Sequence, residues 1–423
     1  MTHVLIIGAG AVGAHSAIAA RRAGFEVTIV ESGEPGGEQS ASFGNAAWLS
    51  SHSVLPPSEP GIWKKVPTYL RDPLGPLAIK PAYMLMAMPW LTRYLLSGWT
   101  ETRVTRTAHA LRRLLSDAPN LHRDVAAEAG LSDFIAADSG LLHIYRDRDA
   151  FLREERAWRI RRETGIGWRE LNADALAARE PHLARSYGFA VEVGEAGYCR
   201  DPGAYVAGLV SYAETLGARR VKAKATGLVL SQGRLKAART DQGDIDAERA
   251  VISAGVHSGP LACASGDRVP LDSERGYHVR IDDVPGEQPI GPLTPVMAHD
   301  RKVVVTKTRN ALRVAGQVEI AGIAAKPNWK RAEILRQHLM AMFPELPRDI
   351  APERLHMWLG HRPSTPDGLP VLGSASGSSD VVYAFGHGHI GLVSSARTGR
   401  LVSQLLANIQ PEIDIEPFSP RRF

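Results

Sequence analysis

Residues 1–31, MTHVLIIGAGAVGAHSAIAARRAGFEVTIVE, decide the fold of the amino-terminal part of the chain. Val4–Ile7 is an unbroken apolar run, as expected for a strand that is buried on both faces of a parallel sheet. Three glycines follow, at Gly8, Gly10 and Gly13. They permit a tight turn, the close approach of a phosphate to the backbone, and the close packing of the next helix on the strand. The stretch therefore predicts a strand, a phosphate-binding turn and a helix.

The position of Glu31 makes this glycine pattern more specific. A lone G-x-G-x-x-G is weak evidence, because ordinary glycine-bearing turns also contain it. Here the glycines follow a strand and open a helix, and a second apolar strand, Glu26–Glu31, ends on an acid about eighteen residues after Gly13. That spacing is typical of a carboxylate that binds a ribose, while the helix N-terminus favours a pyrophosphate. Because Glu31 would repel a 2′-phosphate, the sequence favours FAD or NAD over NADP.

The composition is that of a soluble globular protein. The chain has 423 residues, of which 44% are hydrophobic and 22% are charged, so two domains are expected. It contains no run of about eighteen uncharged apolar residues, and a glycine motif occupies the place of a signal-peptide cleavage site, which predicts a cytoplasmic protein. Cys199 and Cys263 form no C-x-x-C pattern, so we expect neither a disulfide framework nor an iron–sulfur cluster, and no metal site. The net charge of +5 selects no class of partner.

Two charged segments and one basic, aromatic segment lie in the first half of the chain. Residues 101–130 and 147–164 are predicted to be helices whose alternating signs suit a solvated face, and not nucleic-acid binding. Residues 56–100 combine prolines and an apolar run with the basic residues Lys64, Lys65, Arg71 and Lys80 and the aromatic residues Trp90, Tyr94 and Trp99. Two interpretations stay open for this segment: a helical subdomain over the core, or a peripheral contact with the inner face of the plasma membrane.

The end of the chain repeats the pattern of its beginning, with an apolar strand, a glycine-rich turn and a helix. Val381–Phe385 is predicted to be a strand, GHGHIG a glycine-rich turn, and Leu392–Asn408 a helix, while Ala250–Ser253 is another buried strand that opens onto Gly255. We therefore predict an α/β protein with a discontinuous Rossmann-like nucleotide-binding domain and an inserted substrate domain. The latter is expected to be a mixed or antiparallel sheet with helices. The predicted boundaries are 1–55, 200–265 and 355–423 for the first domain, and 56–199 and 266–354 for the second.

Three blocks of sequence carry a resemblance to a known family. They are VLIIGAGAVGAHSA with Glu31, the loop ASFGNAAWLS, and WLGHRPSTPDGLPVLG followed by FGHGHIGL. The chain resembles the D-amino acid oxidase superfamily of flavoproteins, and within it the bacterial D-amino acid dehydrogenases. The match runs from Val4 to about Leu406, is weakest over 101–200, and is most specific at R-P-x-T-P-D-G. It implies FAD as cofactor and oxidation of an amino or imino acid at its α-carbon.

The resemblance implies roles for three catalytic candidates. Arg362 is predicted to lie in a turn before Pro363 and would anchor the substrate carboxylate, because the planar guanidinium can bind both carboxylate oxygens. The alternative for Arg362 is an ordinary salt bridge at the surface. His389 occupies a position from which related enzymes contact the substrate. Related oxidases often carry a tyrosine where this chain has 303–305, all valines, so Tyr277 on an adjacent strand is a candidate, although a core tyrosine is equally open.

The FAD-binding candidates come from the same blocks. The resemblance implies Gly8, Gly10, Ala11, Val12, Gly13, Glu31 and Ser32 in the first block, Ser42, Asn45 and Ala46 in the loop, Thr226 and Gly255 on the adenosine side, and His387, Gly388, Ile390, Gly391 and Leu392 in the last turn. Backbone N–H groups of that turn would face the flavin pyrimidine, and the following helix dipole would favour negative charge on reduced flavin.

These observations predict an FAD-dependent dehydrogenase that oxidises D-amino acids by hydride transfer to flavin N5, giving an imino acid that hydrolyses to a 2-oxo acid and ammonia. A cyclic imino acid such as a hydroxy-D-proline, glycine, or an opine stays open as substrate. So does the acceptor that reoxidises the flavin: a quinone, an electron-transfer protein or oxygen. The rival hypotheses are an NAD-dependent dehydrogenase and a flavin-binding subunit without chemistry of its own.

Overall fold

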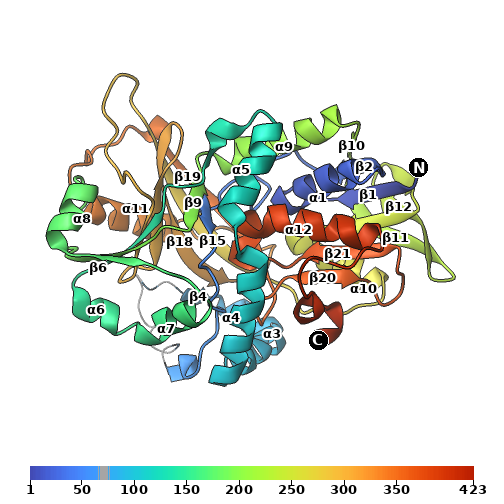
Figure 1. Cartoon of the computed structure of the whole chain (residues 1–423), viewed down its shortest axis with the longest axis horizontal. Coiled ribbons are helices and arrows are strands. Elements are labelled where there is room, and N and C mark those ends of the chain that lie inside the picture. Colours follow the sequence, from blue (N-terminus) through green and yellow to red (C-terminus); the bar gives the residue numbers. More distant parts are fainter. Residues whose placement is uncertain (65, 67–74, 76) are drawn as a thin grey trace.

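The computed structural model describes residues 1–64, 66, 75 and 77–423. Two large sheets lie side by side along the longest axis of the molecule (Figure 1). The six-stranded sheet and its helices occupy the end that carries both termini, and the nine-stranded sheet occupies the other. This arrangement confirms the α/β fold, and each sheet collects segments that are far apart in the chain.

The six-stranded sheet has the predicted Rossmann-like topology. Its order is β10 (Arg219–Lys222), β2 (Glu26–Glu31), β1 (His3–Ile7), β14 (Arg249–Ile252), β21 (Val381–Phe385) and β20 (Val371–Ser374). All neighbours pair in parallel except β20 and β21, which are antiparallel. The helices α1 (Ala11–Arg22), α9 (Pro202–Thr215) and α12 (Gly391–Leu406) belong to this part, and their apolar faces share one core with β1 and β2. The chain therefore leaves this sheet and re-enters it, as predicted.

Glycines set the distance between the first strand and its helices. Gly8 has a φ of +105°, and a Cβ on Gly13 would lie 1.8 Å from the Gly8 carbonyl oxygen. A Cβ on Gly399 of α12 would likewise lie 2.6 Å from the carbonyl oxygen of His15 on α1. No side chain fits at these contacts, so the turn and helix-packing roles predicted for Gly8 and Gly13 are confirmed.

The nine-stranded sheet is mixed and mostly antiparallel. Its order is β19 (Leu355–Ser364), β15 (Asp272–Asp282), β18 (Ala311–Ile320), β17 (Val303–Lys307), β16 (Val296–Ala298), β6 (Leu141–Tyr145), β8 (Phe189–Val193) and β7 (Arg169–Leu171), with β4 (Leu77–Ile79) beside β18. Helix α11 (Lys330–Met342) packs on β15 and β18 and buries its Leu335 and Leu339 in a second core. β19 was predicted with the nucleotide domain, but it pairs with β15 along its length and so belongs to this sheet. The other domain boundaries stay predictions.

The charged segments form helices, as predicted: α4 (Glu101–Leu115), α5 (Ala118–Glu128), α6 (Arg148–Leu152) and α7 (Glu155–Glu163). On α4, Val104, Ala108, Leu111 and Leu115 are buried at helical spacing, and α4 and α5 both pack against α12. Further elements are α3 (Met84–Ser97), α8 (Ala173–Arg179), α10 (Ser258–Ala264), β3 (Trp48–Ser50), β5 (Ile135–Ala136), β9 (Ala196–Cys199), β11 (Ala225–Ser231), β12 (Arg234–Thr240) and β13 (Gly243–Asp246). Among the described residues, no helix is long and apolar enough to cross a membrane.

Candidate active site

A cavity of about 760 Å³ runs from the carboxyl ends of the parallel strands to the inner face of the nine-stranded sheet. Ile7, Glu31, Ser253 and Phe385, at or just after the ends of four parallel strands, all line it. Ligands of open α/β sheets bind at this edge, where the strand order turns back on either side of β1. The volume and the elongated lining suit a dinucleotide together with a small molecule.

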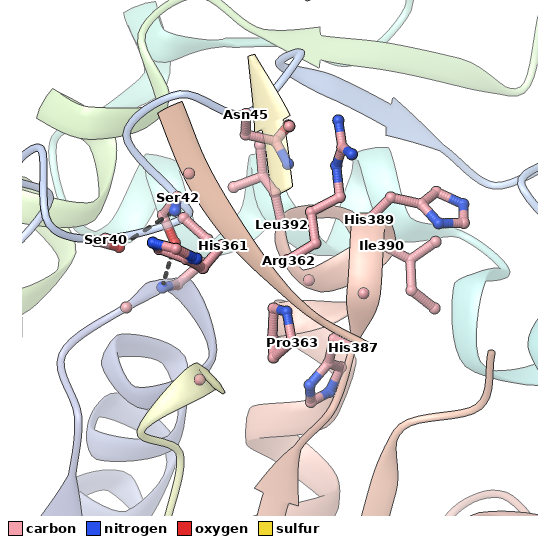
Figure 2. Close-up of a pocket in the computed structure, with 18 of the residues that line it drawn as sticks. Ser40, Ser42, Asn45, His361, Arg362, Pro363, His387, His389, Ile390 and Leu392 are labelled. Atoms are coloured by element: carbon pink, nitrogen blue, oxygen red, sulfur yellow. Dashed lines mark hydrogen bonds between the residues drawn. The ribbon is translucent and has the colours of Figure 1, made fainter. Parts of the chain in front are cut away.

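The N-terminus of α1 forms one wall of the cavity. The Ser42 hydroxyl accepts a hydrogen bond from the Ala11 N–H (3.1 Å), and the Ser40 hydroxyl accepts one from the Ser42 N–H (3.2 Å); Figure 2 shows this pair of contacts. Gly10, the N-cap, carries no side chain, and the first turn of α1 has no acidic residue. The helix end is therefore open to an anion, which suits a pyrophosphate.

The Glu31 carboxylate is held in place by two backbone groups. The Ala9 N–H donates to its Oε2 (2.7 Å), and the Gly33 N–H donates to its Oε1 (3.0 Å). Two fixed oxygens at the end of β2 still have lone pairs for the hydroxyls of a ribose. This geometry is the one that the sequence predicts for a nucleotide without a 2′-phosphate.

The loop 41–47 is fastened to the nine-stranded sheet and, through Ser42, to the start of α1. Arg313 of β18 donates through Nη1 to the Asn45 carbonyl oxygen (2.8 Å), and the Thr306 hydroxyl donates to the Ala46 carbonyl oxygen (2.9 Å). The Asn45 side chain accepts from the Ala47 N–H (2.8 Å). Because the loop is held from the nine-stranded sheet, a cofactor lying along it would contact both halves of the molecule.

Arg362 lies near the end of strand β19, and not in a turn as the sequence predicted. The reason is that β19 continues its pairing with β15 as far as Ser364, so that the proline after Arg362 is part of a strand. Its Nη1 donates to the Gln317 carbonyl oxygen (3.0 Å), and a Cβ at Gly276 would lie 2.3 Å from its Nη2. Gly276 therefore leaves room for the guanidinium, which lines the cavity.

The surroundings of Arg362 favour an anionic ligand. Burial lowers the pKa of this guanidinium, and the charge of Glu274 offsets the effect only in part. Burial also raises the pKa of the Glu274 carboxyl, whose Oε2 accepts a hydrogen bond from Ser364 (2.6 Å). A carboxylate placed against Arg362 would add negative charge beside a guanidinium whose burial Glu274 offsets only in part.

An isolated β-bridge between Ser364 and His387 places the turn after β21 beside the end of β19, which carries Arg362. His389 and Ile390 line the cavity on the same side as Arg362 (Figure 2). His387 is buried, and its Nε2 lies 3.3 Å from the Thr398 hydroxyl. The turn and the helix that follows it are thus confirmed, and they place the positive end of α12 at the cavity.

Tyr277 also lines the cavity, but its hydroxyl is engaged elsewhere. It donates to Glu319 Oε2 (2.7 Å) and accepts from the Asn328 N–H (3.0 Å), and the residue belongs to the core under α11. A substrate-binding role for this hydroxyl stays a prediction, and the geometry favours the alternative of a core tyrosine.

Most predicted cofactor residues converge on the cavity. Its lining includes Gly8, Gly10, Ala11, Val12, Glu31, Ser32, Ser42, Asn45, Ala46, Gly255, His387, Gly388, Ile390, Gly391 and Leu392. Gly13 packs under the turn instead, and the exposed Thr226 donates to the Arg239 carbonyl oxygen, while its neighbour Ala225 lines the cavity. Sequence reasoning missed Glu274, Gly276, Gln317, His52, His143 and Arg161, which also line it.

The fold and the cavity thus define a class of protein that fits a dinucleotide across one sheet edge and a small carboxylate under a second sheet. A family model described as FAD dependent oxidoreductase, DAO, matches residues 3–405, and the chain belongs to this family. FAD as cofactor and oxidoreductase as class are therefore confirmed, and the alternative of an NAD-dependent dehydrogenase is excluded.

Two curated relatives cover nearly the whole chain. A D-amino-acid oxidase of Bradyrhizobium diazoefficiens is 59% identical over 421 residues, which is 100% of this chain and 99% of that protein. A D-amino acid dehydrogenase of Cereibacter sphaeroides is 28% identical over 426 residues, covering 99% of this chain and 95% of the relative.

Solved structures show the same fold at low identity. Glycine oxidase from Geobacillus kaustophilus has a TM-score of 0.76 at 20% identity, with 100% of both chains covered. L-proline dehydrogenase from P. horikoshii has a TM-score of 0.74 at 17% identity, covering 100% of this chain and 97% of that one.

Replacing Glu31 with Ala is expected to weaken FAD binding about tenfold to a hundredfold, because an ionic hydrogen bond to a ribose is worth about 1.5–3 kcal/mol. Flavin retained after dilution and dialysis measures the effect. Glu26→Ala, at the exposed start of the same strand, is the matched control and should keep its flavin. Full flavin retention by Glu31→Ala would exclude the ribose role.

Acid is expected to destabilise the protein below about pH 6.5. Burial lowers the pKa of His15 to about 3, of His122 to about 4 and of His387 to about 3, all from 6.5. Above pH 6.5 both folded and unfolded chains keep these imidazoles neutral. Between pH 6.5 and 4 only the unfolded chain takes up the protons, so the free energy of unfolding falls, by up to about 1.4 kcal/mol per pH unit for each histidine.

Urea unfolding at pH 7.5, 6.5 and 5.5 measures this slope. His122→Asn should flatten it relative to the wild type, whatever the variant's absolute stability. Equal stability at the three pH values would show that the buried imidazoles are not held neutral.

Proposed function

We propose that this flavoprotein oxidises the Cα–N bond of D-amino acids, giving the imino acid that hydrolyses to a 2-oxo acid and ammonia. The observation that carries the proposal is Arg362, a guanidinium held by Gln317 and Gly276 beside the turn at 386–391. The relative named D-amino-acid oxidase, at 59% identity along the full length, supports the same substrate class.

The chain's own residues would bind and orient the substrate. A planar guanidinium pairs with both oxygens of a carboxylate, so Arg362 would fix the substrate's α-carbon as well as its position. The inner face of the nine-stranded sheet supplies a wall in which Ala315, Val304 and Met297 stand side by side on neighbouring strands. This wall is apolar and leaves room for an uncharged side chain.

FAD, when bound, supplies the acceptor for the hydride. The residues that would hold it line one cavity: Glu31 would bind the ribose, the N-terminus of α1 the pyrophosphate, and loop 41–47 and the turn 386–391 the rest of the cofactor. The N-terminus of α12 begins at this turn and would favour negative charge there. Orientation and this electrostatic effect are the chain's main contributions to hydride transfer.

A second proposal concerns the surface around α3, which we propose contacts a membrane peripherally. The side chains of Leu85, Met86 and Met88 are exposed on α3, Trp99 is exposed just after it, and Trp63 is exposed earlier in the same segment. Trp90, which the sequence suggested for this contact, is buried instead and donates to the Ser364 carbonyl oxygen (3.0 Å), so it belongs to the protein interior. Lys65 and Arg71 lie outside the described residues.

Arg362→Ala is expected to slow flavin reduction by a D-amino acid about a hundredfold or more, because a charged hydrogen-bonded pair is lost. Arg362→Lys keeps the positive charge but cannot bind both carboxylate oxygens, so flavin reduction should slow less than in Arg362→Ala. Flavin content should stay normal in both. The measurement is a panel of D- and L-amino acids with a dye acceptor, with and without oxygen, which also identifies the acceptor.

Arg336→Ala is the matched control, since Arg336 pairs with Glu333 on the outer helix α11. An Arg362→Ala protein that keeps FAD and oxidises its amino acid with near wild-type kcat/KM would overturn the assignment. So would a wild-type holoenzyme that oxidises no D-amino acid in the panel.

Flotation with anionic liposomes tests the membrane contact. The protein is expected to rise with the vesicles at low ionic strength and to stay down at high salt, because surface attraction is screened. A Leu85→Glu, Met86→Glu variant should lose flotation while keeping its flavin. Wild-type protein that stays at the bottom at low salt contradicts the proposal.

A further inference from the structure

A chain of polar side chains leads from the wall of the cavity to the surface. Ser50 Oγ lies 3.2 Å from His52 Nδ1, and His52 Nε2 lies 2.7 Å from His143 Nε2. His143 Nδ1 lies 2.8 Å from His299 Nε2, and His299 Nδ1 forms an ion-pair contact of 2.5 Å with Glu154 Oε2 that lacks the angle of a hydrogen bond. We infer that these five residues conduct the proton released by the substrate amine from the cavity to solvent.

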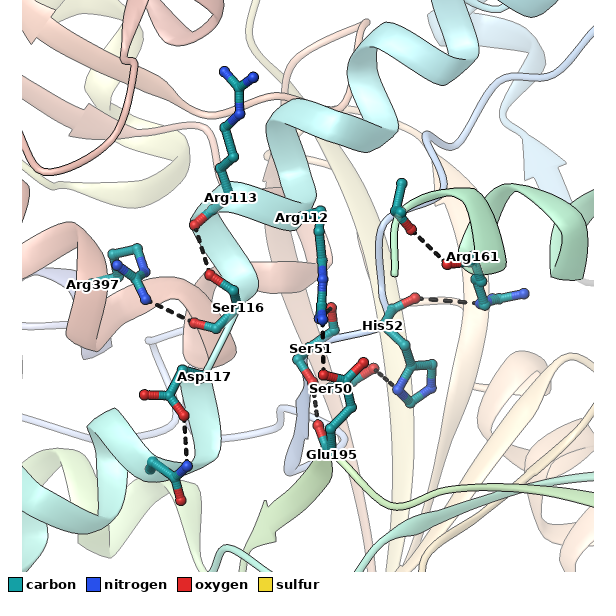
Figure 3. A network of polar contacts seen from close by, with 12 residues as sticks. Ser50, Ser51, His52, Arg112, Arg113, Ser116, Asp117, Arg161, Glu195 and Arg397 are labelled. Atoms are coloured by element: carbon teal, nitrogen blue, oxygen red, sulfur yellow. Dashed lines mark hydrogen bonds and ion pairs between the residues drawn. The ribbon is translucent and has the colours of Figure 1, made fainter. Parts of the chain in front are cut away.

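The two ends of this path lie in the right places. Ser50, His52 and His143 line the cavity, and Figure 3 shows Ser50 and His52 meeting below Arg161. The side chain of Glu154 is 26% exposed at the surface. The middle of the path is shielded from bulk solvent, because His143 is almost fully buried and His299 is 9% exposed, although His52 and His143 also face the cavity. A proton that entered at Ser50 would reach bulk solvent at Glu154.

The surface carboxylate fixes the direction of every link. Glu154 accepts only, so His299 must carry its proton on Nδ1 and accept at Nε2. His143 then carries its proton on Nδ1, and His52 carries its proton on Nε2 and accepts from Ser50 at Nδ1. Ser53 in turn donates to Ser50 (2.8 Å). All donors point outward, as a path that moves protons from the cavity to the surface requires.

Charges around the path keep it neutral. Burial lowers the pKa of His52 and of His143 well below 6.5, and the nearby charge of Arg161 adds to the effect for both. Arg112 from α4 acts on His52, and Lys302 acts on His143. A proton is therefore not stored on these imidazoles; it passes through them.

At the outer end of the path, the pKa values of Glu154 and His299 are set by each other as well as by burial. Burial raises the pKa of the Glu154 carboxyl, but His299 and Lys302 outweigh it and bring the pKa down to about 2. Burial lowers the pKa of His299, while Glu154 raises it and Lys302 and Arg161 lower it. Glu154 is therefore ionised at neutral pH. A proton that it accepts from His299 passes readily to water.

Aromatic rings enclose the path. Trp48 and Trp158 meet the His143 ring edge-on, with centroids 5.6 and 5.1 Å away, and Tyr145 stacks on His299 at 4.5 Å. These ring contacts hold the imidazoles in register. The three imidazoles do not form a metal site, since among the described residues no group of three or more His, Cys, Asp or Glu side chains could hold a metal ion.

The proton balance of the proposed reaction requires such an exit, and in this respect the inference rests on the proposed function. An amino acid binds as an ammonium ion and must lose one N–H proton before the hydride leaves the α-carbon. That N–H bond breaks and a proton joins the Ser53–Ser50 pair; each link then passes its own proton outward, and Glu154 releases one to solvent. One proton enters and one leaves, and each imidazole is left as its other tautomer; the three rings regain their starting tautomers by proton exchange with water before the next passage.

The test follows proton release with a pH indicator and flavin reduction together, after anaerobic mixing of the holoenzyme with a D-amino acid at low buffer. Glu154→Gln keeps an acceptor oxygen but takes no proton, so both signals should slow about tenfold or more. Raising the concentration of a small buffer should restore them, and Glu154→Asp should be close to wild type. His299→Asn should behave as Glu154→Gln.

Glu170→Gln is the matched control, because Glu170 is an exposed carboxylate that pairs with Arg148 outside the path. If Glu154→Gln and His299→Asn reduce flavin at the wild-type rate, or slow without rescue by buffer, the path is overturned while the wild-type reaction stands. If the wild type oxidises no D-amino acid, the proposed function itself is overturned, which is a different result from the loss of the proton path alone.

Nitrogen-15 NMR of histidine-labelled holoenzyme gives a readout apart from activity. We expect neutral rings at pH 7 with the proton on Nε2 of His52 and on Nδ1 of His143 and His299, assigned with the variants. The opposite tautomers, or a charged ring in the middle of the path, would overturn the outward direction.

Discussion

The pairing of β19 with β15 is the constraint on which the site depends. It runs along the whole of β19 and continues into the bridge between Ser364 and His387, so the nine-stranded sheet is fastened to the six-stranded one at the cavity. This junction sets Arg362 beside the turn at 386–391. Without it, the substrate anchor and the far end of the cofactor path would belong to separate bodies. The buried Trp90 of α3 strengthens the same junction through its hydrogen bond to the Ser364 carbonyl oxygen.

Close contacts play the corresponding role at the other end of the cofactor path. Gly8, Gly13 and Gly399 bring β1, α1 and α12 together at distances that no Cβ allows. The open helix end of α1 and the carboxylate of Glu31 then face one cavity. The family membership and the relative at 59% identity agree with this arrangement along the full chain.

Local patterns predicted the parts of this protein that are local in sequence. The glycine turn, the acid that ends β2 and the last strand, turn and helix could all be placed because their signals lie within a few residues. Arg362 was placed in the site by resemblance, but its strand was missed, since prolines usually mark a turn and only pairing with β15 overrides them here. Gly276 and Gln317, which position it, carry no signal of their own in the sequence.

The histidine path shows why the rest could not be predicted. His52, His143 and His299 are separated by 91 and 156 residues, and only the sheet register between β6 and β16 and the turn that follows β3 bring them together. Each one alone is an ordinary buried histidine. Their common direction appears only when Glu154, at the N-cap of α7, is added at the surface.

The central claim is that Arg362 binds the carboxylate of a D-amino acid at the far end of the FAD path. The most direct measurement is a crystal structure of the FAD-loaded protein with a non-reactive carboxylate analogue of its substrate. We expect both carboxylate oxygens within about 3 Å of Arg362 nitrogens, with the analogue between the apolar wall of the nine-stranded sheet and the bound flavin. An analogue whose carboxylate lies away from Arg362, on any other residue, would contradict it.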